Sequence, residues 1–430
     1  MLSNLALALV LGSTPHLGVA KTWCMDGSHW HATSPFSMLQ ASQTSQTSQT
    51  TEDKRTEAQK KADAKAEREL KKLEEDILSD KKMGKEAADY YDREYKPTKD
   101  TAAQKRVEDI GERLALIVNA NEFPVLWGDK RHSEFEYKFK VVDNPDVNAF
   151  SLPGGYIYVY QGLVDFAQSD EELAGVLAHE ICHASQRHVA TLQKEQAKMS
   201  TIQIPLILVG ILTGGASSAL AASTAGNLVG TAVTNGWSMK AETSADAGGY
   251  ELMVAAGYDP TGMLTFMERL QVQQSIIERT IDLGIFRTHP PSKERADRIE
   301  RFMRKDSLEI RRSRVTIEFR VLPKEISENK VDLYFGKKKL FSVGGDHPRE
   351  RAKELAKKLN EFLDSVPELF EVTTGENGVI FGRSKTLITL TEHDAAANNV
   401  SLEKLQNDAS KAIRSSIFNL AYHIWDSRGG

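Results

Sequence analysis

The sequence has few cysteines and no excess of charge of either sign. Only Cys24 and Cys182 occur among 430 residues, too few for a disulfide framework, and a chain of this length can bury a core without one. The 60 acidic and 55 basic side chains give a formal charge of −5. A nucleic-acid-binding protein would need a basic face. The composition therefore argues against a nucleic-acid partner, and the length predicts two or three domains.

The sequence also lacks an uninterrupted apolar run of the roughly 20 residues that cross a bilayer. Leu5–Leu11 is an apolar run of signal-peptide length, and Gly18–Ala20 offers small residues for cleavage, although no Lys or Arg precedes the run. We predict a signal peptide at residues 1–20 and a periplasmic or secreted protein. Cys24 follows Lys, Thr and Trp rather than small residues, which argues against lipidation.

Residues 199–239 contain no Asp, Glu, Lys or Arg. The apolar run Ile202–Leu212 lies within this segment, but Pro205 and several glycines interrupt it. This segment raises the possibility of a membrane-spanning segment. The interruptions favour instead a soluble helical hairpin packed near a cleft, or a peripheral contact with a membrane.

Changes in composition divide the rest of the chain. Residues 21–84 hold a Ser-Gln-Thr repeat and then a Lys/Glu/Ala-rich stretch to Asp80, which predicts a disordered and charged helical linker. Residues 85–305 have globular patterning, and residues 306–430 predict a C-terminal α+β domain of unknown function, with a strand over Val315–Val321, a hairpin at 379–390 and helices at 352–363 and 402–424. The scattered basic residues of this domain predict a solvated face, and the domain remains a candidate for binding a protein partner.

The globular part predicts two strands followed by a long helix. The strands are expected at 137–142 and 155–160, where β-branched and aromatic residues concentrate. Ser169 and Glu172 stand three apart, as at the start of a capped helix, which we expect to run to about Ala197. Arg187 and His188 are expected on later turns of this helix, where they would support the chemistry or pack.

The predicted helix contains His179-Glu180-Ile181-Cys182-His183, an HExxH sequence. Residues four apart share a helical face, so both imidazoles can reach one zinc ion while Glu180 lies beside the attacking water. A histidine pair alone more often packs than binds metal. Cys182 occupies a variable position and is expected to pack.

A third metal ligand must come from elsewhere, because no third histidine follows at the metzincin spacing. Glu242 and Asp246 stand four apart at the start of another predicted helix. Glu242 could complete a set of two histidines and one glutamate, and Asp246 could accept the outer N–H of a ligating histidine. The alternative is a pair of solvated helix carboxylates, which is less favoured beside HExxH.

With these residues in place, the chain resembles the gluzincin-type HExxH zinc metallopeptidases that include HtpX, BepA and the CAAX prenyl endopeptidases. The resemblance covers roughly residues 85–305 through ordered segments: Asn148-Ala149-Phe150 with Pro153-Gly154-Gly155, Glu172 to Val176, HExxH with Arg187-His188, Glu242 to Asp246, and His289-Pro290-Pro291-Ser292. It implies an α+β fold with a mainly helical metallopeptidase domain and a small sheet.

The resemblance also implies roles for individual residues. His179, His183 and Glu242 would bind one Zn²⁺ per chain, and Glu180 would be the general base. His289 and Arg295 would lie near the metal and stabilise the oxyanion, although in some periplasmic members the corresponding histidine is a latch on the metal. Asn148, Ala149 and Phe150 would belong to an edge strand that binds substrate by strand addition.

We therefore predict a zinc metalloendopeptidase that hydrolyses protein or peptide substrates, with a role in quality control of cell-envelope proteins. Two alternatives stay open. One is a latched, peptidase-like chaperone or assembly factor, and the other is an integral membrane protease similar to HtpX.

Overall fold

The computed structural model describes residues 23–26, 29–32, 56–199, 237–277, 289 and 293–424. The chain divides into two compact units, residues 1–65 and residues 66–430. In the first unit, β1 (Trp23–Asp26) and β2 (His29–Ala32) pair in an antiparallel hairpin. The predicted signal peptide, the Ser-Gln-Thr repeat, nearly all of the uncharged segment 199–239 and the Pro-Pro-Ser after His289 lie outside the described residues.

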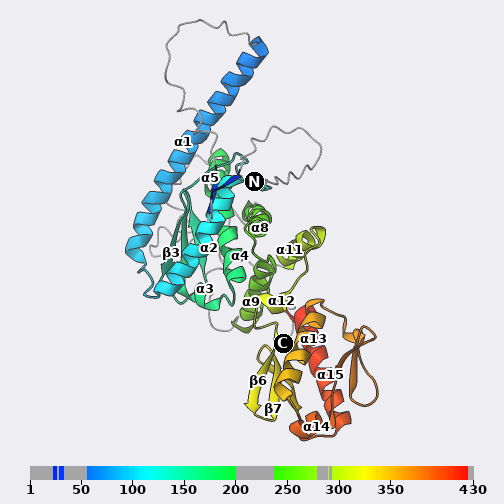
Figure 1. Ribbon diagram of the computed structural model, residues 1–430. Helices are drawn as coiled ribbons and strands as arrows, with labels where there is room; N and C mark the ends of the chain where they lie inside the picture. Colours follow the sequence, from blue (N-terminus) through cyan, green and yellow to red (C-terminus); the bar gives the residue numbers. More distant parts are fainter. Residues whose placement is uncertain are drawn as a thin grey trace, which may run out of the picture. The chain divides into compact units, whose positions relative to one another are not determined.

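The charged stretch forms a single helix, α1 (Glu57–Glu94), which is longer than the sequence pattern predicts (Figure 1). Its residues up to Lys72 are exposed, as expected for a solvated helix. Its later turns pack instead, and the buried positions include Asp80, Gly84 and Tyr91. Tyr91 contacts the rings of Phe150 and Tyr158 at centroid distances of 5.2 and 5.9 Å. The predicted start of the peptidase domain at residue 85 therefore falls inside α1.

The HExxH helix lies at the centre of the helical part of the second unit. It is α4 (Asp170–Ser185), and it contacts α2 (Thr101–Ala120), α8 (Trp237–Ala255) and α9 (Thr261–Ile277). Ser169 caps it by accepting a hydrogen bond from the Glu172 N–H. Residues 172–182 are buried without exception, so the helix is enclosed on all sides and its histidines point into the core.

The prediction of one continuous helix to Ala197 is wrong, because the HExxH helix ends at Ser185. Arg187 has a φ of 53°, and a new helix, α5 (His188–Met199), begins at the next residue. Arg187 is buried and its guanidinium contacts two carboxylates, with Nε 2.6 Å from Asp80 Oδ2 and Nη1 2.7 Å from Asp129 Oδ2. These charged contacts offset the cost of a left-handed backbone at a residue other than glycine.

A three-stranded sheet stands beside α4. Its strands are β3 (Lys138–Val142), β4 (Ala149–Leu152) and β5 (Tyr156–Tyr160), in the order β3-β5-β4. The pair β3 and β5 is parallel, and β4 is antiparallel to β5. Strand β4 is thus an edge of this sheet and contacts α4. The two strands predicted from sequence, at 137–142 and 155–160, are confirmed within one residue at each end.

Within the described residues, three further helices belong to this helical part: α3 (Gln161–Phe166), α11 (Lys293–Lys305) and α12 (Arg312–Val315). Helix α11 contacts α8 and α9 and brings buried Arg295 toward α8. No helix in the described ranges is long and apolar enough to cross a membrane.

The C-terminal part has a core of its own. Its strands and helices confirm the predicted α+β fold. A meander of β6 (Val321–Ser327), β7 (Lys330–Phe335) and β8 (Lys338–Gly344) packs against α13 (Pro348–Asp364) and α15 (Leu402–Phe418). The remaining elements are η2 (Leu369–Glu371), β9 (Val372–Thr374), β10 (Val379–Gly382), β11 (Lys385–Thr389), α14 (Glu392–Asn398) and η3 (Asn419–His423).

The strand predicted over Val315–Val321 is wrong. Val315 ends α12, and the backbone N–H groups of Ile317 and Glu318 donate to Gln168 Oε1 at 2.7 and 3.1 Å. One glutamine from the peptidase part therefore holds this segment in a bend, and the strand starts only at Val321. The predicted hairpin and both predicted helices of this part are present.

Replacing Gly84 by Ala should detach the end of α1. Helix propensity favours Ala by about 1 kcal/mol, but a Cβ at this position would lie 1.7 Å from the Pro153 carbonyl oxygen. We expect a net destabilisation of about 1–3 kcal/mol from overpacking, seen as faster amide hydrogen exchange across residues 80–94. The exposed neighbour Glu86→Ala is the control. Equal exchange in the two variants would contradict this packing.

Candidate metal centre

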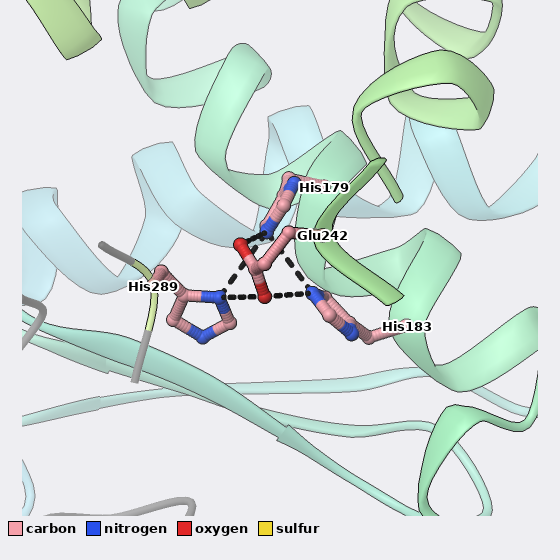
Figure 2. A group of neighbouring side chains, drawn as sticks. All are labelled: His179, His183, Glu242 and His289. Atoms are coloured by element: carbon pink, nitrogen blue, oxygen red, sulfur yellow. Dashed lines mark hydrogen bonds and ion pairs between the residues drawn. The ribbon is translucent and has the colours of Figure 1, made fainter. Parts of the chain in front are cut away.

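The two histidines of HExxH project from one face of α4, as their spacing predicts. The Nε2 atoms of His179 and His183 are 3.0 Å apart, and the rings are nearly perpendicular at 75° (Figure 2). Their Nε2 atoms thus converge on one point, while each Nδ1 faces a different neighbour.

Glu242 of α8 lies across from this pair. Its Oε2 is 3.3 Å from His179 Nε2, and its Oε1 is 3.3 Å from His183 Nε2. His289 completes the group, with Nδ1 3.0 Å from Glu242 Oε1 and 3.2 Å from His179 Nε2. The four donor atoms lie within 4.8 Å of one another, so they could hold a metal ion. Three imidazoles and one carboxylate converge in a buried site from three separate parts of the chain.

Glu180 lies beside this group on α4 and is only 2% exposed. Its Oε1 is 3.4 Å from His289 Nε2, and its Oε2 has no hydrogen-bond partner within the part of the chain that the structure describes. A buried carboxylate oxygen without a hydrogen-bond donor lowers the stability of the folded protein. Its position next to the donor group suits a carboxylate that takes up a proton from a reacting molecule.

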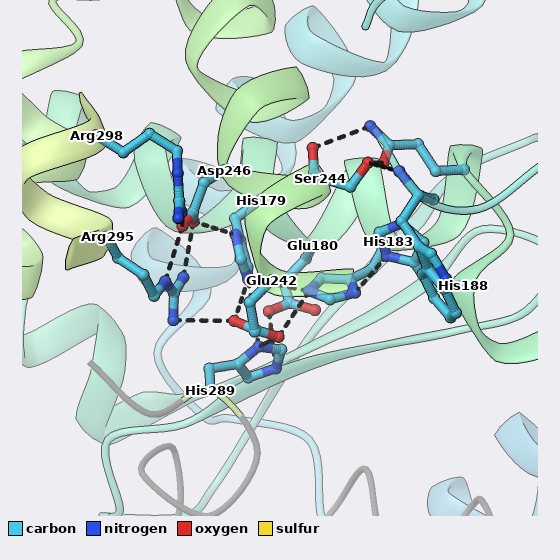
Figure 3. A network of polar contacts seen from close by, with 12 residues as sticks. His179, Glu180, His183, His188, Glu242, Ser244, Asp246, His289, Arg295 and Arg298 are labelled. Atoms are coloured by element: carbon cyan, nitrogen blue, oxygen red, sulfur yellow. Dashed lines mark hydrogen bonds and ion pairs between the residues drawn. The ribbon is translucent and has the colours of Figure 1, made fainter. Parts of the chain in front are cut away.

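Arg295 and Asp246 hold Glu242 and His179 in place (Figure 3). The Arg295 guanidinium contacts both Asp246 oxygens, at 2.8 Å from Nε and 2.7 Å from Nη2, and its Nη1 is 2.9 Å from Glu242 Oε2. Asp246 Oδ1 in turn lies 3.1 Å from His179 Nδ1. The predicted contact between Asp246 and the outer nitrogen of a histidine is therefore present in the structure.

These contacts set the charges of the site. Burial opposes ionisation of Asp246 and Glu242, but Arg295 holds the pKa of Asp246 at about 2, and His289 and Arg295 hold the pKa of Glu242 well below its ordinary value. Burial likewise opposes protonation of His179, yet the two carboxylates raise its pKa to about 10. The negative potential that favours a proton on His179 also favours a metal cation, so the residues present fit a metal site.

His183 has a different environment from His179. Burial, aided by the positive charge of His179 and against the pull of Glu242, lowers the pKa of His183 to about 4. Its Nδ1 faces not a carboxylate but the Nδ1 of His188, 2.9 Å away. The sequence interpretation missed this contact, since a continuous helix would have carried His188 away from His183. No glycine or proline marks the break at Arg187.

A small, open pocket adjoins the donor group. It is lined by the apolar side chains of Val176, Met263, Phe266, Met267 and Leu270, together with Gly175, His179, Glu180, His289 and Arg295. The pocket therefore joins the polar group to an apolar wall formed by α9.

The residues predicted to bind substrate lie at the sheet edge. Asn148 precedes β4 and its carbonyl accepts from the Tyr160 N–H at 2.9 Å. Ala149 is fully buried, and Phe150 stacks on Tyr158 at 5.1 Å. The Phe150 side chain therefore belongs to the core, and only the backbone of β4 is suited to pair with another strand.

Comparison with known proteins agrees with this geometry. Residues 102–303 match the model of peptidase family M48, and residues 332–419 match a domain of unknown function (DUF8459). The chain is 30% identical over 200 residues to metalloprotease LoiP of Escherichia coli, covering 46% of this chain and 73% of that protein. The chain belongs to peptidase family M48. Members of this family depend on a metal, and the M48 match contains all four donor residues.

In two other relatives the match covers less than half of the relative's length. The chain is 28% identical over 221 residues to the β-barrel assembly-enhancing protease of Escherichia coli, covering 49% of this chain and 42% of that protein. It is 31% identical over 171 residues to a mitochondrial metalloendopeptidase of Schizosaccharomyces pombe, covering 40% and 48%. The chain thus spans about two fifths of the length of the assembly-enhancing proteases that it matches.

Removing Arg295 should destabilise the M48 domain most when no metal is bound. An Arg295→Leu variant leaves two buried carboxylates without their counter-charge, which costs about 3–5 kcal/mol. A bound divalent metal would offset part of this loss by neutralising Glu242. Unfolding midpoints should be compared with and without added metal, using the exposed Arg301→Leu on the same helix as the control. A loss that is the same in both conditions would contradict the shared role of Arg295 and the metal.

Proposed function

We propose that this protein is a zinc-dependent metalloendopeptidase that hydrolyses peptide bonds in protein substrates. The observation that carries the proposal is the position of buried Glu180 beside the group formed by His179, His183, Glu242 and His289. The relatives that are named as proteases and metalloproteases support it.

Zinc is the metal that this donor set fits best. Zinc binds imidazole nitrogen and carboxylate oxygen, and catalytic zinc sites use three protein ligands with a further position open. We assign His179, His183 and Glu242 as the ligands of one Zn²⁺ per chain. When bound, zinc would lower the pKa of water toward neutrality and polarise the scissile carbonyl.

Glu180 is the proton carrier of the proposed reaction. Its carboxylate accepts a proton from the attacking water as the water oxygen adds to the carbonyl carbon. The C–N bond then breaks, and Glu180 returns the proton to the amine nitrogen that leaves. Arg295 was predicted to stabilise the oxyanion, and in the structure its guanidinium contacts Asp246 and Glu242. We therefore propose that Arg295 acts first by holding these two carboxylates in position.

The substrate is proposed to bind as an extended strand along β4. Among the described strands β4 pairs only with β5, so its other edge could supply backbone groups for strand addition. In this binding mode, specificity comes from substrate side chains at alternate positions. The apolar pocket next to Glu180 would receive one substrate side chain beside the scissile bond. Both features favour unfolded protein segments over folded substrates.

We propose further that the protein acts in quality control of cell-envelope proteins, in the periplasm or after secretion. The names of the β-barrel assembly-enhancing proteases support this setting. We also propose that the protein makes a peripheral contact with a membrane and that its C-terminal domain binds a protein partner.

Replacing Glu180 by Gln should abolish proteolysis and leave zinc binding intact. The amide keeps the shape of the carboxylate but cannot accept the proton, and we expect at least a 10²-fold loss, on the order of the usual contribution of a general base. Casein cleavage and zinc content should be measured for the parent and the variant. Cleavage by Glu180→Gln at the parent's rate would rule out this mechanism.

A second function, a latched peptidase-like assembly factor, is favoured by one observation. His289 Nδ1 lies among the other three donor atoms, in the position that a substrate or water would need. We propose that His289 closes the site in this conformation and must move away for catalysis.

The His289→Ala variant shows whether His289 is a latch or a catalytic residue. If His289 is a latch, three ligands remain, zinc is retained and cleavage of unfolded casein rises above the parent's rate. If His289 contributes to catalysis, zinc is retained and cleavage falls. We expect the rise, since His289 contacts the ligands His179 and Glu242 directly.

A further inference from the structure

His188 connects a metal-binding histidine to the protein backbone. It is 2% exposed, its Nδ1 lies 2.9 Å from His183 Nδ1, and its Nε2 lies 2.9 Å from the Trp127 carbonyl oxygen (Figure 3). Its ring also lies against the Trp127 indole at a centroid distance of 5.5 Å. His183, His188 and the Trp127 carbonyl thus form a line of hydrogen bonds that leads into the metal site.

The chemistry of this line leaves one arrangement of protons. His188 is buried, and its two ring nitrogens face an imidazole and a carbonyl oxygen, not a carboxylate, so its ring is neutral and carries one proton. A carbonyl oxygen can only accept, so that proton lies on Nε2 and leaves Nδ1 bare. His183 must therefore donate from its own Nδ1, which leaves His183 Nε2 without a proton and with its lone pair directed at His179, Glu242 and His289. We propose that His188 is a positioning residue that fixes the metal-binding tautomer of His183 before a metal arrives.

The backbone just before this carbonyl is hydrogen-bonded to α8. The backbone N–H groups of Leu126 and Trp127 both donate to Ser244 Oγ, at 2.9 and 3.0 Å, and Ser244 donates to Gln186 Oε1 at 2.6 Å. Ser244 lies on α8 only two residues after Glu242. The helix that supplies the proposed carboxylate ligand therefore also contacts the segment that ends in the carbonyl facing His188.

Two local features make room for His188. The left-handed backbone at Arg187 ends the HExxH helix, so that His188 begins a new helix and its ring faces back toward His183. Gly128, at a φ of 122°, leaves space on the other side, because a Cβ there would lie 2.5 Å from the Gln186 carbonyl oxygen and 2.9 Å from His188 Cδ2. Both features allow the His188 ring to lie next to His183, as the proposed role of His188 requires.

The arrangement differs from that of the neighbouring ligand. His179 is supported by the charged carboxylate of Asp246, whereas His183 is supported by a neutral imidazole that ends at a backbone carbonyl. Outer partners of this kind fix the tautomer of a ligand and change metal affinity by about 10- to 100-fold. The inference rests on the metal site proposed above, and its test includes a measurement that needs no metal.

The direct test is the tautomer of His183 in the metal-free, full-length protein. Long-range ¹H–¹⁵N correlation spectra of histidine-labelled protein distinguish a proton on Nδ1 from one on Nε2, and His183 is assigned by comparison with His183→Gln. We expect the proton on Nδ1 of His183 and on Nε2 of His188. A proton on Nε2 of His183 would overturn the proposal.

Zinc affinity gives a second, independent readout. His188→Leu removes the acceptor and should weaken zinc binding, measured by competition with a chromophoric chelator, by about 10- to 100-fold. His188→Asn places an amide oxygen near the position of Nδ1 and should recover most of this loss. The control is His132→Leu, which removes another half-buried histidine whose Nε2 lies 3.0 Å from a carbonyl oxygen, that of Asn119, and should leave zinc affinity unchanged.

The outcomes separate this inference from the proposed function. Equal zinc affinities for His188→Leu and His188→Asn would overturn the role of His188 while leaving the metallopeptidase intact. A parent protein that binds no zinc would contradict the proposed function, and the tautomer spectrum would still decide the inference.

Discussion

The ion pair between Arg295 and the carboxylates of Glu242 and Asp246 is the interaction on which the site depends. These two acids lie one helical turn apart on α8, and both are almost fully buried. Without a positive charge between them, two ionised carboxylates would not remain together in a core. Because Arg295 pairs with both, Glu242 stays ionised, as a metal ligand must be, and Asp246 stays ionised as the partner of His179.

The enclosed position of α4 explains why so many supporting contacts are needed. A helix at the surface could leave the outer nitrogens of its histidines to water, but residues of α4 have neighbours on every side. Each outer nitrogen must therefore meet a protein group. His179 meets a carboxylate and His183 meets an imidazole, so the two ligands of one motif differ in the charge that stands behind them.

The sequence predicts which residues form the site better than it predicts the contacts that hold them in place. Spacing alone places His179 and His183 on one helical face and offers Glu242 as a third donor. The resemblance adds His289 and Arg295, and the structure brings these residues together. The break at Arg187 was missed because buried ion pairs with distant carboxylates stabilise it, and no local signal marks them. A signal was present at Gly84, since a glycine within a charged helix indicates the close approach of another backbone. The strand expected at 315–321 failed for a tertiary reason, the contact with Gln168.

The order of the donor residues along the chain has a consequence for biosynthesis. The HExxH helix is made early, but His289 stands 110 residues after His179, and Arg295 follows 49 residues after Asp246. During translation, the ligand helix α8 therefore emerges before the arginine that neutralises it. A ribosome-bound chain cannot assemble the charged cluster until α11 has been synthesised, so the proposed metal site forms only when nearly the whole M48 domain is available to fold.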